Sequence, residues 1–442
     1  MCNIFACAGV YVPEYGRLIG IQKKHKDILM KPDQQRDMRQ VIAENLRKAR
    51  KCKGLSQTEL SASAKVGIGT IRNIERGVGN PRYSTLDTIA KILGAPVSDL
   101  MQDRNKLRNV RFRAAVEKPS RRRMYSRDRV LSEISVKMDQ YQYMESIIAE
   151  FNKKARNAPI KMREYIFEPI CESKKGKARD LEKAKAKAVA ARELLVKNGV
   201  LKASAVKKGV NVDPVRDICG LLESAGIRLL LTSLASSDWY GLSVAADKYW
   251  KRPAIVVNDW ERITTERKIF SAAHELGHLL MHLGSYNVEY ESDDPDEEAE
   301  AHCFASHFLM PKETFESEWE DAEGHSFAQT VWKVKHIFGV SYQVVLWRLL
   351  NEYGVKDAFD KYKDSCNKHG YRVKGVLNKM EHYPLPEKAF MTDRLAKMIR
   401  VALENDLVSP SRAAEVAGLT LEHMRQIQST WIQRNLDRRV CP

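Results

Sequence analysis

Two histidines four residues apart, His274 and His278, mark the segment of this sequence with the clearest capacity for chemistry. Residues at positions i and i+4 lie on the same face of an α-helix, so both imidazoles can reach one Zn²⁺ ion at roughly 2.0–2.1 Å. Glu275 lies about 100° round the helix from His274, which places its carboxylate beside a water molecule at the metal and not on the metal. The segment therefore predicts one zinc ion with Glu275 as general base. The alternative is a buried helix that has these residues by chance.

A catalytic zinc site requires a third protein ligand and one position left open for water. A third histidine at the metzincin spacing is excluded, because Met281 and Gly284 stand where that pattern requires glycine and histidine. A glutamate on the following predicted helix, residues 296–309, is the alternative. The apolar face of that helix comprises Ala301, Phe304, Ala305, Phe308 and Leu309. Glu298 falls on the inward side, whereas the glutamates at 297 and 300 are expected to project further outward.

The two helices and their flanks resemble the ImmA/IrrE family of metallopeptidases. The likeness rests on Ala-His-Glu-Leu-Gly-His at 273–278, Glu298, Phe-Ala at 304–305, Leu-Met-Pro at 309–311 and flanking matches at 253–258, 267–270, 338–341 and 348–349. It covers most of residues 190–355. The resemblance implies a zincin-like fold with a small sheet, in which His274, His278 and Glu298 hold the zinc ion. Glu275 is the general base by the same resemblance.

One position departs from the family pattern, because His302 stands where the family usually has asparagine. His302 follows Glu298 by four residues, so it could donate a hydrogen bond to that carboxylate and orient it. It could also compete for the metal ion. Two further histidines on the same helices, His282 and His307, are interpreted as buried groups with hydrogen-bond partners and not as ligands.

Three short apolar runs precede the histidine motif and predict strands at 227–231, 241–245 and 254–257. Helices are predicted at 189–198 and 215–225. A strand at the edge of a cleft can pair with an extended peptide and hold it over the metal ion. The second and third strands are the candidates for that role.

The region from Ile42 to Leu100 has the pattern of five short helices. Ser56 and Glu59 form a capping-box pattern at the start of one of them. The next helix is predicted at 68–75 and ends at Arg76-Gly77, with glycine at the C-cap. Leu-Ser-Gln at 55–57, Thr-Ile-Arg at 70–72 and Ile-Glu-Arg-Gly at 74–77 resemble the phage-repressor (XRE-type) helix-turn-helix.

By this resemblance, residues 68–75 are the recognition helix that enters a major groove of a double-stranded DNA operator. Gln57 is expected at the edge of the groove, and Glu75 and Arg76 are expected to form a structural pair. The outward residues of the helix are Ile68, Gly69, Thr70, Arg72 and Asn73. Of these, Arg72 and Asn73 can make bidentate contacts to guanine and adenine. The alternative is a helical module that binds protein, and a homodimer is left open.

These features predict an α+β, mostly helical, chain in five parts. The parts are an N-terminal tail at 1–37, a helix-turn-helix domain at 38–102, a basic and partly helical connector at 103–188, the metallopeptidase domain at 189–355 and a helical C-terminal region at 356–442. Met38 is a plausible internal start. Within the last part, residues 392–427 favour a helical packing module over a second helix-turn-helix-like unit.

The charge of the chain favours a polyanionic partner, since 74 Lys and Arg residues against 57 Asp and Glu residues give a formal net charge of +17. Basic residues crowd 39–127 and 174–187, and acidic residues crowd 289–300, which suggests two activities. The second basic run is interpreted as a solvated helix face. No apolar run approaches the roughly 18 residues of a membrane helix. Eight scattered cysteines without a Cys-x-x-Cys pair indicate reduced thiols and a cytoplasmic location.

We therefore predict a DNA-binding transcriptional regulator with a zinc-dependent endopeptidase domain. The family resemblance implies a protein substrate, a DNA-bound repressor, whose cleavage controls genes of a mobile element or a stress response. The alternative is a non-proteolytic, antitoxin-like regulator whose metal domain acts as a sensor or a dimerisation module. Self-cleavage is also left open.

Overall fold

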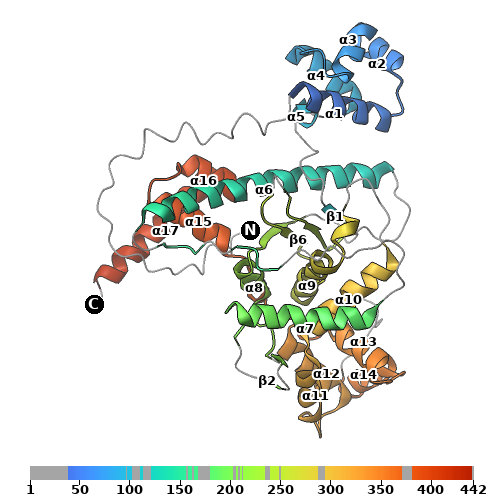
Figure 1. The fold of residues 1–442 in the computed structure, drawn as a ribbon, viewed down its shortest axis with the longest axis vertical. Coiled ribbons are helices and arrows are strands. Elements are labelled where there is room, and N and C mark those ends of the chain that lie inside the picture. Colours follow the sequence, from blue (N-terminus) through green and yellow to red (C-terminus); the bar gives the residue numbers. More distant parts are fainter. Residues whose placement is uncertain are drawn as a thin grey trace. The chain divides into compact units, whose positions relative to one another are not determined.

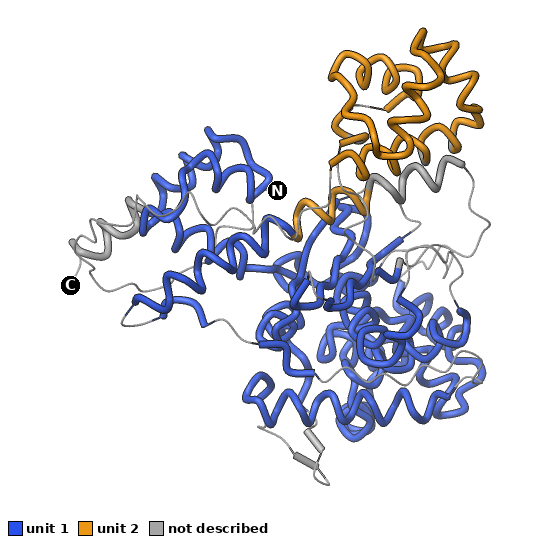
Figure 2. Tube along the Cα trace, turned by 45° about the horizontal axis from the view of Figure 1, so that its top comes forward, with its two compact units in different colours: residues 1–9, 108–117, 139–442 blue, residues 10–107, 118–138 orange. Residues whose placement is uncertain are grey.

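The computed structural model is predominantly helical with one four-stranded sheet, which confirms the predicted fold class (Figure 1). It describes residues 38–95, 97–101, 110–112, 121–155, 158–161, 164–167, 180–202, 206–207, 210–211, 213–233, 239–247, 250–286, 294–370 and 381–440. The predicted tail at 1–37 and the acidic residues 289–293 lie outside these ranges. The chain divides into two compact units (Figure 2), residues 10–107 with 118–138, and residues 1–9 with 108–117 and 139–442.

The smaller unit contains the five helices expected from the sequence. They are α1 (Met38–Cys52), α2 (Gln57–Ala64), α3 (Ile68–Glu75), α4 (Tyr83–Leu93) and α5 (Val97–Met101). The Ser56–Glu59 capping box is present at the start of α2. Aliphatic side chains from all five helices form the core, among them Leu46, Leu60, Ile71, Ile74, Leu86, Ile89 and Leu100. The five helices are therefore stabilised by the apolar stripe that each one buries against the others.

The larger unit is built round a sheet with the strand order β1-β5-β6-β4. The strands are β1 (Val110–Phe112), β4 (Arg228–Thr232), β5 (Gly241–Val244) and β6 (Ala254–Asn258). Strand β4 runs parallel to β6, whereas β5 is antiparallel to both β6 and β1. The three predicted strands are confirmed to within one residue at each end. Strand β1 was not predicted, because it is only three residues long and lies in a basic segment, although Val110 and Phe112 alternate there with arginines.

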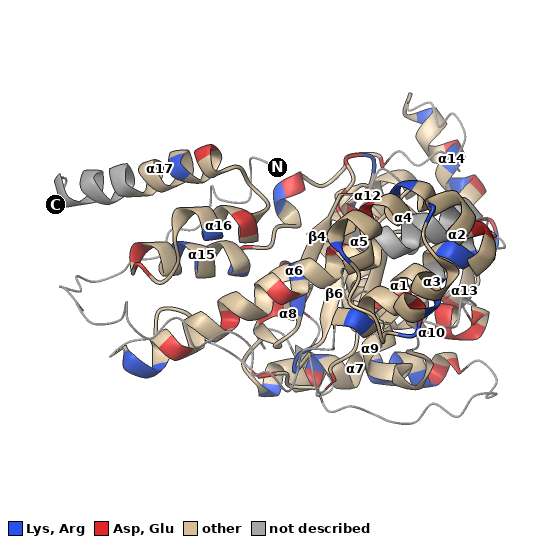
Figure 3. Cartoon of the chain, turned by 90° about the horizontal axis from the view of Figure 1, so that it is seen from above, with Lys and Arg blue, Asp and Glu red and all other residues tan. Residues whose placement is uncertain are grey.

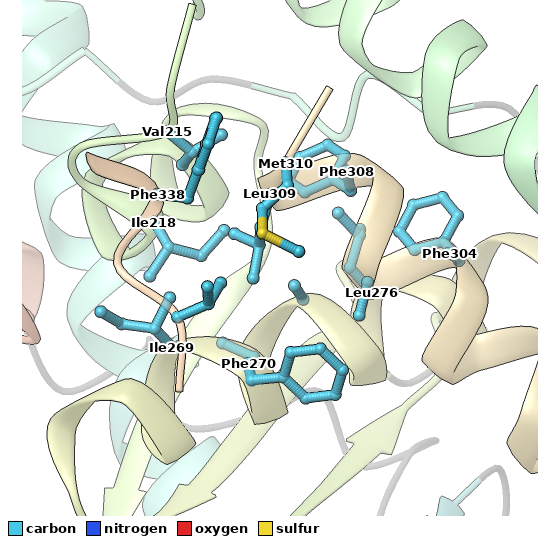
Figure 4. Packing of buried hydrophobic residues seen from close by; sticks show 14 of the residues in the cluster. Val215, Ile218, Ile269, Phe270, Leu276, Phe304, Phe308, Leu309, Met310 and Phe338 are labelled. Atoms are coloured by element: carbon cyan, nitrogen blue, oxygen red, sulfur yellow. The ribbon is translucent and has the colours of Figure 1, made fainter. Parts of the chain in front are cut away.

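Three helices pack one upon another, beginning at this sheet. Helix α9 (Thr265–Met281) packs on β5 and β6, α10 (Pro295–Leu309) packs on α9, and α7 (Leu181–Lys197) packs on α10. Helix α9 is buried along nearly its whole length because the sheet and α10 cover it from different sides. Figure 4 shows Leu276 of α9 among the phenylalanines of α10 in the core of this unit.

Helix α7 starts eight residues before its predicted start, and its first two turns contain residues 181–187 of the predicted basic run. Ala184, Ala188 and Ala191 are buried, while Lys183, Lys185 and Lys187 are only partly exposed. Basic and acidic residues both occur along its length (Figure 3). Small alanines at helical spacing allow α10 to approach closely, and the long lysine stems can run along the packed surface. Asp180 caps the helix, since its side chain accepts a hydrogen bond from the Lys183 amide.

The remaining elements are mainly helices. They are α6 (Arg121–Lys154), which crosses the boundary between the two units, α8 (Ile218–Ser224), α11 (Lys312–Glu320), α12 (Phe327–Phe338), α13 (Tyr342–Glu352), α14 (Ala358–Lys368), α15 (Arg394–Glu404), α16 (Pro410–Ala417) and α17 (Leu421–Val440), with the short turns η5 (Leu283–Ser285) and η6 (Glu387–Ala389) and the strand pair β2 (Val206–Lys207) and β3 (Val210–Asn211). Helix α8 starts later than the predicted 215–225, because Asp217 caps it through the Gly220 amide.

The core of the larger unit continues beyond the predicted end of the metallopeptidase domain at 355. Ala358, Tyr362, Cys366 and Phe390 belong to the same buried cluster as α9 and α10. In the C-terminal helices, Arg394 donates a hydrogen bond to the carbonyl of Glu223 on α8. This contact supports a packing role for the C-terminal helices.

Within the described ranges, no helix combines the length and the apolar character needed to cross a membrane.

Candidate metal centre and nucleic-acid interface

Helix α9 presents the histidine motif from a rigid position. Thr264 caps its start by accepting a hydrogen bond from the Arg267 amide at 3.3 Å. Strand β5 approaches α9 closely at Gly241, where an added Cβ would lie 3.2 Å from Cγ of Glu275. His274, Glu275 and His278 are each at most 1% exposed. The motif is therefore buried, and electrostatic interactions are stronger there than at the surface.

A second glycine brings α10 onto α9. An added Cβ at Gly277 would lie 2.9 Å from Cδ1 of Phe304, closer than real Cβ contacts come. Phe304 is itself fully buried. The close approach of the two helices at this point brings the first turns of α10, with Glu298, to His274 and His278.

Three potential metal ligands converge between the two helices. The Nε2 atoms of His274 and His278 are 2.9 Å apart. The Glu298 carboxylate lies 3.2 Å from Nε2 of His274 and 3.0 Å from Nε2 of His278. Ligand atoms round a tetrahedral zinc ion lie roughly 3.3 Å apart, given bonds of about 2.0–2.1 Å. Two imidazole nitrogens and one carboxylate at this spacing fit a zinc ion.

The protonation preferences of these groups also suit a cation. Burial lowers the pKa of His278 well below its ordinary value, and the positive charge of Arg111 acts in the same direction. Burial alone would raise the pKa of Glu298, but the hydrogen bonds of His274 and His278 outweigh it and hold that pKa far below its usual range. Neutral imidazole and ionised carboxylate are the forms that bind a metal ion.

A chain of hydrogen bonds supports His278 from behind. Nδ1 of His278 is 2.9 Å from Nδ1 of His282, and Nε2 of His282 is 2.9 Å from the Glu300 carboxylate. Such contacts fix the orientation and tautomer of a ligating imidazole. The expectation that Glu297 and Glu300 project outward is wrong, since the exposed fractions of the three glutamate side chains at 297, 298 and 300 are 15%, 17% and 19%. Arg111 and His282 cover the two that were expected outside.

The carboxylate of Glu275 accepts a hydrogen bond from one hydroxyl group, which a second hydroxyl group supports in turn, and the sequence did not indicate either of them. Ser243 Oγ donates to Glu275 at 2.7 Å and lies 2.8 Å from the Tyr286 hydroxyl. Because a serine has one hydroxyl proton, Tyr286 is the donor in the second bond. Burial raises the pKa of Tyr286 well above its ordinary value, so the phenol keeps its proton. Ser243 could have been noticed as the one polar residue of an apolar strand.

The other predicted histidines have partners of their own. Nδ1 of His302 is 3.0 Å from the backbone carbonyl of Glu298, and its ring meets the His274 ring edge-on with centroids 4.7 Å apart. His302 thus contacts the ring of one proposed ligand, His274, and the backbone of another, Glu298. Its role in orienting the Glu298 carboxylate stays a prediction. His307 pairs with Glu352 at 2.8 Å, away from the three ligands.

A basic side chain from β1 also reaches the centre. Arg111 pairs with Glu297, and its Nη2 lies 3.4 Å from the Glu298 carboxylate. Burial disfavours a charged guanidinium, but the negative charge of Glu297 outweighs it and raises the pKa of Arg111. This contact could not be predicted from the sequence, because Arg111 is one of many basic residues of the connector.

In the smaller unit, the predicted recognition helix α3 has the expected division of faces. Ile71 and Ile74 are buried. Of the proposed DNA-contacting residues, Ile68 is partly exposed and Gly69, Thr70, Arg72 and Asn73 are exposed. Their contacts to DNA stay a prediction.

The predicted Glu75–Arg76 pair is wrong. Glu75 is buried and pairs with Arg50 of α1 at 2.6 Å, so the ion pair ties α3 to the first helix. Gln57 donates to the same carboxylate at 2.7 Å. Arg76 is exposed. The partner of Glu75 is thus a residue 25 positions away in the sequence and not its neighbour.

The fold and these two sites define a chain that joins a helix-turn-helix module to a zincin-type domain. Comparison with known families identifies the two parts. Residues 222–350 match the IrrE N-terminal-like domain of the M78 peptidases, and residues 46–100 match a helix-turn-helix family. The chain thus combines an XRE-type helix-turn-helix with an ImmA/IrrE-like domain, as the sequence resemblance predicted. This combination is that of a DNA-binding transcription regulator with a metallopeptidase-type domain.

The comparison with solved structures found two regulators at low identity and low TM-score. One is PlcR of Bacillus thuringiensis in complex with the peptide PapR7 and DNA, at 13% identity and a TM-score of 0.17, covering 77% of this chain and 99% of that one. The other is the apo form of the competence regulator ComR of Streptococcus vestibularis, at 12% identity and a TM-score of 0.14, covering 89% of this chain and 93% of that one. No curated protein matches the chain.

Replacing Gly277 by alanine should destabilise the larger unit and weaken metal binding. The new methyl group would force Phe304 and α10 away from α9, and overpacking of this kind costs about 1–3 kcal/mol. Thermal unfolding and zinc titration measure the two effects. Gly69→Ala is the control, because that helical glycine has open space around it and the substitution should stabilise the helix. Unchanged zinc affinity in Gly277→Ala would contradict the role assigned to the close helix contact.

Proposed function

We propose that this chain is a transcription regulator whose larger unit is a zinc-dependent endopeptidase, and that it cleaves a DNA-bound repressor to control genes of a mobile element or a stress response. The observation that supports the proposal most directly is the convergence of His274, His278 and Glu298 within about 3 Å of one another next to Glu275. The proposed location is the cytoplasm, where operator and repressor are found.

In this proposal, His274, His278 and Glu298 hold one zinc ion. When bound, the ion supplies Lewis-acid polarisation of a peptide carbonyl and of an attacking water molecule. Glu275 would accept a proton from the attacking water as its oxygen adds to the carbonyl carbon, and would then deliver that proton to the amine nitrogen as the C–N bond breaks. Ser243 donates a hydrogen bond to one oxygen of Glu275, and Tyr286 donates to Ser243, so that the two hydroxyl groups together orient the carboxylate.

The second activity is sequence-specific DNA binding by the smaller unit. We propose that α3 enters the major groove with Gln57, Ile68, Gly69, Thr70, Arg72 and Asn73 at the DNA surface. The buried Arg50–Glu75 pair holds α3 against α1, and Gln57 is tethered to the same carboxylate. The recognition surface is therefore held rigidly before DNA binds.

Arg72→Ala should weaken binding to the operator relative to random DNA by about 1–3 kcal/mol. In this proposal the exposed guanidinium contacts a guanine edge, so its loss should relax specificity at one base pair. Electrophoretic mobility shifts with operator and scrambled duplexes measure the difference. Arg76→Ala removes the same charge from the next turn and serves as the control. Equal loss on both duplexes for Arg72→Ala would mean that Arg72 contacts only phosphate.

The peptidase proposal is tested by incubating the zinc-loaded chain with repressors encoded near its own gene, each bound to its operator. We expect a cut at a single site in one repressor, detected by mass spectrometry, and loss of the cut after chelation and its return with added zinc. A chain that holds stoichiometric zinc and regulates normally, but cleaves neither a repressor nor itself, would be the non-proteolytic, antitoxin-like regulator.

A further inference from the structure

The outer edge of β5 is already occupied by another part of the same chain. Strand β1 pairs with it antiparallel, with Val110 opposite Val244, Arg111 opposite Ser243 and Phe112 opposite Leu242. The other edge of β5 is paired with β6. Strand β5 is also the strand that contacts Glu275, through Gly241 and Ser243. An extended segment on its outer edge therefore passes directly beside the proposed catalytic residues.

The side chain of Arg111 points toward the metal centre. Directly opposed residues of an antiparallel pair have their side chains on the same face of the sheet, and Ser243, opposite Arg111, faces Glu275. Arg111 is only 7% exposed. It pairs with Glu297, and its other terminal nitrogen is 3.4 Å from Glu298.

The groups that receive the guanidinium come from a different part of the chain. Glu297 and Glu298 lie in the first turn of α10. Ser285, at the end of η5, donates to the Glu297 carboxylate at 2.5 Å and fixes it. These three residues lie inside the segment 222–350 that matches the peptidase family, whereas β1 lies outside it. We call Glu297, Glu298 and Ser285, which receive the Arg111 side chain, the acidic recess. The acidic recess thus lies within the metallopeptidase-type domain, whereas Arg111 lies outside it.

Strand β1 has few contacts with other regular secondary structure. Strand β1 is three residues long, and within the described residues its one strand partner is β5. A short edge strand of this kind can be exchanged for another extended segment, because strand addition relies on backbone hydrogen bonds that any sequence can make. The side chain in the acidic recess then decides which sequence is preferred.

We propose that β1 is an intrachain occupant of the peptide-binding edge of β5, and that Glu297 with Ser285 forms a recess selecting a basic side chain in the protein segment that replaces it. This inference rests on the proposed function and specifies its substrate class. The substrate presents an extended segment with arginine or lysine at the position of Arg111. The resting chain is self-inhibited until β1 leaves.

The proposal is tested by peptide binding, which does not depend on cleavage. The probe is a fluorescent nine-residue peptide with the sequence of residues 107–115, titrated by anisotropy against the full chain in which Glu275→Gln prevents hydrolysis. Arg111→Ala in the chain should raise the affinity for this peptide about tenfold or more, because the competing strand loses its anchor. Glu297→Gln added to that chain should reverse the gain. Glu323→Gln, at an exposed acid, should not.

The peptide itself provides the matched comparison. Replacing the arginine that corresponds to Arg111 should abolish binding, whereas replacing the one that corresponds to Arg113 removes the same charge and should have little effect. Equal affinities of the two altered peptides would overturn the proposed recess. Unchanged peptide affinity on Arg111→Ala in the chain would overturn the proposed self-occupancy.

A second variant leaves Arg111 intact and guards against misfolding. Val110→Cys with Val244→Cys places two thiols on directly opposed residues of β1 and β5. Oxidation should lock β1 in place and prevent peptide binding, and reduction should restore it. Equal binding in both redox states would overturn the proposal. If the chain cleaves a repressor but none of these changes alters its affinity for the peptide, only this inference is wrong. If the changes alter peptide affinity as expected but no repressor is cleaved, only the proposed function is wrong.

Discussion

Glu275→Gln should lower the rate of repressor cleavage by about 10²–10⁴-fold, the usual contribution of a general base. The amide cannot take a proton from water, but it keeps an oxygen that can accept the hydrogen bond from Ser243. The substitution leaves the donor atoms of His274, His278 and Glu298 in place. We therefore expect the variant to retain one zinc ion per chain and its melting temperature.

Quantified cleavage of the repressor, together with zinc analysis of the same sample, checks this expectation. Glu300→Gln is an informative comparison, because that glutamate contacts the centre through His282 and should mainly weaken zinc binding. Full residual cleavage by Glu275→Gln would refute the assignment of the base. Loss of zinc in that variant would instead show that Glu275 is a ligand.

Lys335→Met should destabilise the larger unit by about 3–5 kcal/mol, because it breaks a buried ion network by removing its cation. Lys335 is fully buried, and its Nζ lies 3.1 Å from Glu266 and 2.9 Å from Glu381. Glu266 is in the first turn of α9 and is also fully buried. Without the lysine, two carboxylates would remain in an apolar setting with no cation between them.

Urea denaturation followed by circular dichroism measures the loss. Lys361→Met is the control, since Lys361 forms a surface ion pair with Asp357 in which both side chains are more than half exposed, and such pairs contribute little. Adding Glu266→Gln and Glu381→Gln to Lys335→Met should restore part of the stability. Similar denaturation midpoints for Lys335→Met and Lys361→Met would contradict the importance of the network.

The local part of the site was predictable from the sequence. The spacing of His274 and His278 depends only on the pitch of one helix, and the apolar face of the next helix placed Glu298 inward. The exposed positions of α3 followed from the same periodicity. Strands β4, β5 and β6 were recognisable as short apolar runs between turn residues.

Contacts between distant segments were not predictable. Ser243, Tyr286 and Arg111 approach the centre from a strand, a loop and the connector, and their positions depend on how the sheet and helices pack. The Glu75 ion pair was misassigned for the same reason, because Arg50 on another helix is its partner. Helical periodicity identifies which face of a helix is buried. It cannot identify which residue from another segment contacts the opposite face.

The extension of the buried cluster past residue 355 has a practical consequence. A recombinant fragment cut at Leu350, where the family match ends, would lose Tyr362, Cys366 and Phe390 from its interior. It would also lose Glu381 and the amide of Leu385, both of which hold the ionic pair at the start of α9. Loss of activity in such a fragment would be a result of the truncation and would not test the proposed chemistry. A fragment that contains the metallopeptidase-type domain therefore has to extend at least through Phe390.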